Sequence, residues 1–117
     1  MMMLAKRVNF KHVTTHFFTL LLNLVVDGTS NEYGAVVLQT IKKKLIKEYP
    51  FFKYVEIRDD SVKVDFAINT VSKQQVGKLF KSVIGMISSD FLKLYLQQRL
   101  DKEDLEFFNE IGLGLSS

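Results

Sequence analysis

The chain has 117 residues, of which 47% are hydrophobic and 25% charged. This composition excludes a disordered chain and indicates one globular domain over residues 1–117. The chain has no cysteine, which excludes disulfides, thiolate metal sites and a cysteine nucleophile. Its formal net charge of +3 is too small to indicate nucleic-acid binding by charge alone.

The most apolar run, at positions 17–26, is interrupted by Thr19 and Asn23. A transmembrane helix needs about 20 apolar residues, so this run is too short to span a bilayer. The basic stretch that precedes it is long for a signal peptide. We therefore expect no transmembrane segment and no cleaved leader, and the lack of cysteine fits a cytoplasmic protein.

Two helices are predicted in the first half of the chain. Apolar residues at helical spacing predict the first over residues 9–27, and they cover so much of its circumference that we expect burial on more than one side. Thr29 and Glu32 match a capping box for a second helix over residues 30–48. Pro50 ends this helix and begins the next segment.

Residues 51–68 give the only clear strand pattern in the sequence. Asp59 and Asp60 are interpreted as the turn of an antiparallel hairpin rather than as a cation site. A two-residue turn there gives a register in which Glu56 faces Lys63 on the polar side. On the other side, apolar except for Lys53, the register pairs Ile57 with Val62, Val55 with Val64, Lys53 with Phe66, and Phe51 with Ile68.

The last third of the chain is predicted to be helical. Ser72 is a cap candidate, and one uninterrupted apolar stripe favours a single long or bent helix over residues 73–99. Residues 88–90 are the alternative break, because Ser and Asp both favour caps. Asp101 is expected to cap a final short helix over residues 102–110.

The element order is therefore α-α-β-β-α-α, an α+β domain with the antiparallel hairpin packed under helices. A lone hairpin is marginal in water and leaves two unpaired edges. Pairing an edge with a second copy would give a four-stranded sheet across a homodimer. The residues expected at that dimer edge are Phe52, Tyr54, Lys63 and Asp65.

His12 and His16 are the two histidines of the chain, and their spacing places both on one helix face, as a metal or acid–base pair requires. The sequence lacks the Glu next to the first His that a metalloprotease helix carries. No third ligand is evident, since Asp27 would lie about a helix length away. We therefore predict no metal site, no cofactor and no catalytic residues.

The strongest local charge signal is a basic cluster at the end of the second helix, formed by Lys42, Lys43, Lys44 and Lys47. Such a face is the candidate surface for an anion or nucleic acid, although no nucleic-acid-binding motif accompanies it. Residues 101–110 are in contrast acidic. The basic and acidic helices are expected to attract each other, within the chain or between copies.

These patterns favour a small non-enzymatic interaction or regulatory module that self-associates as a homodimer and has a further protein as a partner. One alternative is a nucleic-acid-binding protein that uses the basic helix face. Another is a ligand binder or enzyme with a pocket between helices and hairpin, around Tyr54, Asp65 and the two histidines.

Overall fold

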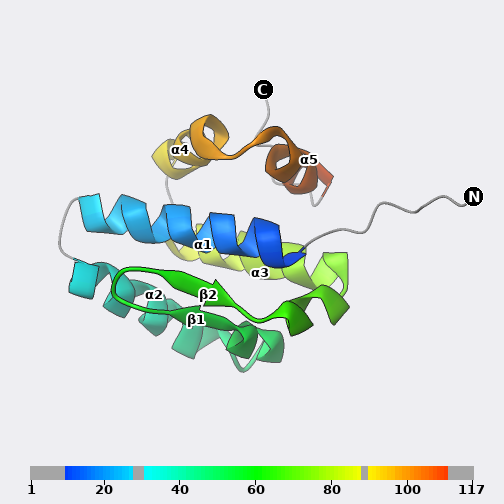
Figure 1. Cartoon of the computed structure of the whole chain (residues 1–117), viewed down its shortest axis with the longest axis horizontal. Coiled ribbons are helices and arrows are strands. Elements are labelled where there is room, and N and C mark those ends of the chain that lie inside the picture. Colours follow the sequence, from blue (N-terminus) through cyan, green and yellow to red (C-terminus); the bar gives the residue numbers. More distant parts are fainter. Residues whose placement is uncertain (1–9, 28–30, 88–89, 111–117) are drawn as a thin grey trace, which may run out of the picture.

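The computed structural model describes residues 10–27, 31–87 and 90–110. These residues form an α+β fold in which helices pack around one antiparallel hairpin, as the sequence predicts (Figure 1). No described helix has the length and apolar character needed to cross a bilayer. The elements in chain order are α1 (Phe10–Asp27), α2 (Asn31–Leu45), the 3-10 helix η1 (Pro50–Tyr54), β1 (Val55–Ile57), β2 (Val62–Val64), the 3-10 helix η2 (Phe66–Thr70), α3 (Lys73–Ile87), α4 (Asp90–Arg99) and α5 (Lys102–Glu110).

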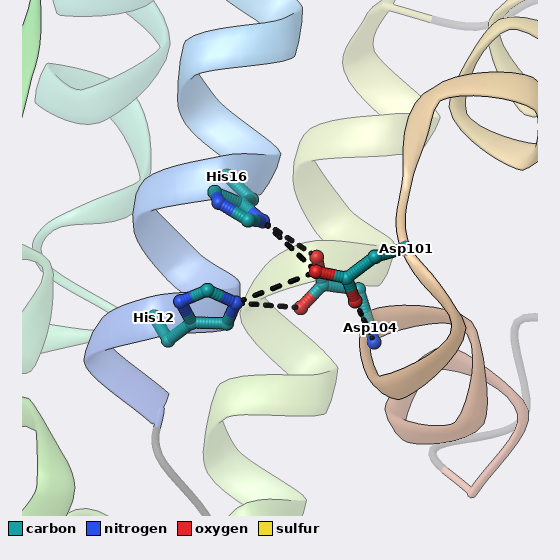
Figure 2. A group of neighbouring side chains, drawn as sticks. All are labelled: His12, His16, Asp101 and Asp104. Carbon is teal, nitrogen blue, oxygen red and sulfur yellow. Dashed lines mark hydrogen bonds and ion pairs between the residues drawn. The ribbon is translucent and has the colours of Figure 1, made fainter.

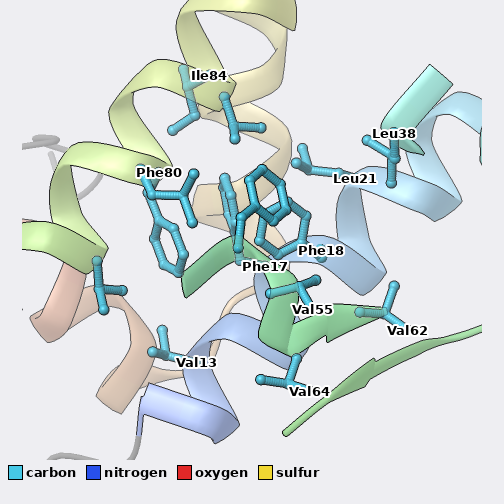
Figure 3. Close-up of a cluster of buried hydrophobic side chains, with 14 of the residues drawn as sticks. Val13, Phe17, Phe18, Leu21, Leu38, Val55, Val62, Val64, Phe80 and Ile84 are labelled. Carbon is cyan, nitrogen blue, oxygen red and sulfur yellow. The ribbon is translucent and has the colours of Figure 1, made fainter. Parts of the chain in front are cut away.

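Helix α1 is the centre of the fold. The hairpin and α2 lie on one side of it and α4 and α5 on the opposite side (Figure 1). Phe17 and Phe18 are adjacent in sequence and point in different directions, yet both are fully buried. Phe17 stacks on Phe80 of α3 with ring centroids 4.2 Å apart (Figure 3). Phe18 lies 5.4 Å from Phe52 of η1. The prediction that this helix is buried on more than one side is confirmed.

The hairpin has the predicted register around its turn. Val55 pairs with Val64 and Ile57 with Val62, and all four side chains are buried. The N–H of Arg58 donates to the carbonyl of Ser61 (2.9 Å), which closes the turn at residues 59–60. Glu56 and Lys63 face each other on the exposed side. The alternation of buried and exposed residues therefore fixed the register.

Beyond Tyr54 and Asp65, which the predicted register also pairs and which a main-chain hydrogen bond joins, the predicted strands are wrong. Residues 50–54 and 66–70 form 3-10 helices, so Lys53 does not pair with Phe66, nor Phe51 with Ile68. Pro50 presets a helical φ at the start of η1. At η2 the Asp65 carboxylate accepts the N–H of Ala67 (2.8 Å), which turns the chain out of the strand.

Helix α2 covers the outer edge of β1. In this register the main-chain groups of Val55 and Ile57 point away from β2. The carbonyl of Ile57 accepts a hydrogen bond from Gln39 Nε2 (2.8 Å), and that of Val55 accepts one from Lys42 Nζ (2.7 Å). Two acceptors that an edge strand would leave unpaired are therefore satisfied within the chain.

The preferred single helix over residues 73–99 is wrong, and the chain breaks at the alternative position. Helix α3 ends at Ile87, α4 begins at Asp90, and residues 88–89 lie outside the described part. Leu96 of α4 and Leu100, which follows the helix, are buried. The reversal brings these side chains back against the core, whereas a straight 27-residue rod (~40 Å) would carry them away from it.

One of the two predicted caps at α2 and α3 can be checked in the structure. The Ser72 hydroxyl accepts the N–H of Gln75 (3.2 Å) and caps α3 as expected. The predicted Thr29 cap lies outside the described residues. Helix α5 has the predicted bounds, and its cap is part of the site below.

Candidate metal centre

The first turns of α1 present two imidazole rings to the same neighbour. His12 and His16 are one helical turn apart, and their ring centroids are 4.1 Å apart. Both side chains are about half exposed, at 42% and 43%. The N–H of Lys11 donates to Asn69 Oδ1 of η2 (3.0 Å), which fixes the start of the helix. Figure 2 shows both rings directed toward α5.

The start of α5 supplies two carboxylates to those rings. Asp101 is the N-cap, and its Oδ1 accepts the N–H of Asp104 (2.9 Å), as the sequence predicts. Asp104 lies in the first turn, where the helix dipole favours negative charge. Its side chain is only 1% exposed, against 51% for Asp101. The cap hydrogen bond leaves Asp101 Oδ2 as the oxygen that faces the histidines.

Aromatic packing holds α5 at this position. Phe107 lies 5.7 Å from Phe10, and Phe108 lies 5.6 Å from Phe17, measured between ring centroids. Both rings also contact Phe80 of α3. Because α1 and α5 pack through these rings, the histidines and the carboxylates meet across a fixed interface.

The four side chains converge on one point (Figure 2). His16 Nδ1 lies 2.7 Å from Asp104 Oδ2 and 3.9 Å from Asp101 Oδ2. His12 Nε2 lies 3.6 Å from Asp101 Oδ2 and 3.9 Å from Asp104 Oδ1. One ligand atom from each residue can be chosen so that all four lie within 4.8 Å of one another.

This spacing suits a small tetrahedral ion. Zinc binds imidazole nitrogen and carboxylate oxygen at about 2.0–2.1 Å, so a tetrahedral ion holds its ligand atoms roughly 3.3–3.4 Å apart. The four nitrogen–oxygen distances, from 2.7 to 3.9 Å, bracket that value. The N–H of Asp104 orients the Asp101 carboxylate in the way that outer partners orient metal ligands.

The two carboxylates have pKa shifts of opposite direction. The N–H of Asp104 hydrogen-bonds the Asp101 carboxylate and lowers the pKa of Asp101 below its ordinary value of 3.8, with the histidines acting in the same direction. Burial raises the pKa of Asp104 above 3.8, and the nearby Asp101 charge adds to this, while the hydrogen bond to His16 opposes it. A cation at the site would stabilise the ionised form of the buried Asp104 carboxylate.

These shifts predict opposite pH dependences for two variants of the metal-free protein. The raised pKa of Asp104 gives stability that is present below pH 3.8 and lost as pH rises through the raised pKa. Asp104→Asn removes this loss, so its stability relative to the parent should increase as pH rises from 3.8. Asp101→Asn should show the reverse, because a lowered pKa gives stability that is lost as pH falls. Urea unfolding with a chelator at several pH values measures both, and slopes of the same sign would contradict the prediction.

The histidine pair and the Asp101 cap are both evident in the sequence, but nothing in the sequence connects them. His16 and Asp104 are 88 positions apart. The available signal was the predicted short helix with carboxylates in its first turn, which marks an electronegative helix start. Its place beside α1 depends on the chain reversal between α3 and α4, which the sequence pattern did not favour.

The predicted basic surface is only partly free. Lys42 is half-buried and bonds to β1, whereas Lys43, Lys44 and Lys47 are exposed. Helix α2 and the acidic α5 lie on opposite sides of α1, so they do not meet within the chain (Figure 1). Helix α5 instead forms an ion pair from Glu110 to Lys73 of α3.

The residues of the predicted dimer edge have different environments. Phe52 is fully buried in the core, Tyr54 is half-buried, and Lys63 and Asp65 are exposed. Tyr54 and Asp65 are joined at the base of the hairpin by the Asp65 N–H and the Tyr54 carbonyl (2.7 Å). The histidine rings point toward α5 (Figure 2), so the structure does not group them with Tyr54 and Asp65 as the pocket hypothesis expects.

Comparisons with protein-family models, with curated proteins and with solved structures found no match to this chain.

Proposed function

We propose that the protein is a small non-enzymatic regulatory module that binds one divalent transition-metal ion, with Zn²⁺ as the preferred ion. The observation that carries this proposal is the convergence of four ligand atoms from α1 and α5 within 4.8 Å. The ligands would be His12, His16, Asp101 and Asp104.

The ligand types select the class of ion. Two imidazole nitrogens favour Zn²⁺ and related transition metals, whereas Mg²⁺ and Ca²⁺ take oxygen ligands almost exclusively. Because Asp104 is buried, its negative charge lies where solvent screens it poorly, and a bound dication would offset this cost. The half-exposed histidines leave a path for the ion to enter.

The ligand number argues against catalysis. Four protein ligands fill a tetrahedral zinc site, whereas catalytic zinc keeps one position for water or substrate. The ligands also come in pairs from two elements, so an ion bound to all four would connect α1 to α5. This arrangement supports a structural or regulatory role for the ion.

Isothermal titration calorimetry with Zn²⁺ tests the proposal. The protein should bind one ion, and His12→Ala and His16→Ala should each weaken binding by roughly 10- to 100-fold, the loss that removal of a contact supporting a metal ligand already causes. Asp59→Asn, at the exposed hairpin turn, is the matched control and should bind as the parent does. Mg²⁺ should not compete. If Zn²⁺ gives no saturable binding, or if both histidine variants bind like the parent, the proposal fails.

Self-association is a second candidate function, supported by the two edges of the hairpin. Gln39 and Lys42 already occupy the β1 carbonyls, so a second copy would add its strand to β2. Exposed Lys63 and Asp65 lie on and beside that strand, and the neighbouring Phe66 is 70% exposed. Sedimentation at high protein concentration tests this, and a monomer would exclude it. A cytoplasmic location, consistent with the cysteine-free composition, is part of the same proposal.

A further inference from the structure

We propose that occupancy of the metal site determines how firmly α5 stays docked on α1 and α3. We call this effect of the bound ion the latch. This inference rests on the proposed metal-binding function and adds the regulation of the same site.

Helix α5 depends on its surroundings for its structure. It has nine residues, and isolated helices shorter than about 12–15 residues are marginal in water. It therefore persists as a helix through its contacts with α1 and α3. A change in those contacts changes both its docking and its helicity.

Three sets of contacts hold α5, and they differ in strength. At the N-terminal end, Asp101 and Asp104 meet the histidines of α1. In the middle, Phe107 and Phe108 pack into the aromatic core. At the C-terminal end, the ion pair of Glu110 with Lys73 is solvent-exposed, and such pairs contribute little. Among these three sets, the two rings and the four-residue cluster are the ones that contribute most to docking.

The cluster responds to the ion because its ligands are divided between two elements. When α5 leaves, α1 keeps only the two histidines, so the site loses half of its ligands and most of its affinity. By linkage, an ion that binds the docked form more tightly must favour docking by the same factor. Without the ion, the N-terminal attachment of α5 depends on the hydrogen bond between His16 Nδ1 and Asp104 Oδ2 and on the longer contacts of His12.

Release of α5 would expose an apolar surface. Phe107 and Phe108 cover rings of α1 and α3, namely those of Phe10, Phe17 and Phe80. Metal occupancy would therefore control access to an aromatic face of the core, while α2 and the hairpin on the opposite side of α1 stay in place (Figure 1).

Hydrogen exchange measured by mass spectrometry tests the latch on the full chain. We expect the α5 amides of residues 105–110 to exchange roughly tenfold more slowly at free Zn²⁺ ten times above its dissociation constant than in chelator, because docking gains the factor 1 + [Zn²⁺]/Kd. Amides of residues 79–84 in α3 are the internal control and should change much less. The dye ANS should bind more strongly in chelator.

Two variants separate the latch from general stabilisation. Glu110→Gln removes the exposed ion pair at the far end of α5 without touching a ligand, so it should change α5 exchange little and keep the dependence on Zn²⁺. At the same Zn²⁺ concentration His16→Ala should reduce that dependence to about twofold or less. If calorimetry shows Zn²⁺ binding but α5 exchanges equally with and without the ion, the latch is wrong and the metal site stands. If calorimetry shows no binding, the proposed function fails and the latch with it.

Discussion

Zn²⁺ is expected to raise the midpoint of thermal unfolding by roughly 10 °C when the free ion is about 100 times above its dissociation constant. A ligand that binds only the folded state at this excess stabilises it by about 2.7 kcal/mol. The reason is that the four ligands come from α1 and α5, which meet only in the folded chain. Circular dichroism at increasing Zn²⁺ concentration measures the shift.

The histidine variants make this test specific. At the same ion concentration His12→Ala and His16→Ala should show a clearly smaller rise, because a 10- to 100-fold weaker site gains only about 0.4–1.4 kcal/mol. Asp60→Asn, an exposed position in the hairpin turn, should keep the full shift. An equal rise in all four proteins would mean that the ion acts elsewhere, and a fall in the parent would mean that it binds the unfolded chain in preference.

Phe17→Ala is expected to destabilise the protein by about 3–5 kcal/mol, the cost of removing a large buried aromatic side chain. Phe17 is fully buried and contacts Phe18, Phe80 and Phe108. It therefore joins α1 both to α3 and to α5. Since small domains have only about 5–15 kcal/mol of stability in total, this one change removes a large part of it. Urea unfolding, followed by far-UV circular dichroism, gives the free energy.

Two further substitutions serve as controls for the loss of an aromatic ring and for a Phe17→Ala variant that does not fold. Phe66→Ala removes the same ring from a site that is 70% exposed, and it should change stability by no more than about 0.5 kcal/mol. Phe17→Leu fills most of the volume and should cost clearly less than Phe17→Ala, so it remains measurable if the alanine variant does not fold. Equal losses for Phe17→Ala and Phe66→Ala would show that the aromatic cluster does not support the fold.

Local patterns determined much of this fold. The alternation around Asp59 and Asp60 gave the hairpin register, because a slip by one residue would place Glu56 and Lys63 in the core. The Asp101 cap determined the start of α5, because its carboxylate accepts the main-chain N–H of Asp104, only three residues further along the chain. The predicted strands were too long because Pro50 and Asp65 terminate them through local geometry that the apolar pattern does not reveal.

The chain reversal between α3 and α4 was not determined by periodicity. The apolar stripe runs through it in one phase, and a straight helix and a broken one satisfy that pattern equally. Burial decided between them, because Leu96 and Leu100 reach the core only if the chain turns back. The contacts of α2 were likewise not determined by local pattern. Nothing in its lysine run indicated that Lys42 would donate a hydrogen bond to the Val55 carbonyl while Lys43 stays exposed.

The candidate site shows the same division. By itself, the sequence determined an α+β domain, a histidine pair on one helix face and a capped acidic helix start, because each depends on residues within a few positions of one another. Only the tertiary structure decided that these two features face each other. His16 and Asp104, 88 positions apart, meet because Phe107 and Phe108 are buried against α1 and α3. The hydrophobic effect is non-directional, so an apolar pattern in the sequence shows that a face will be buried but not which other face will cover it.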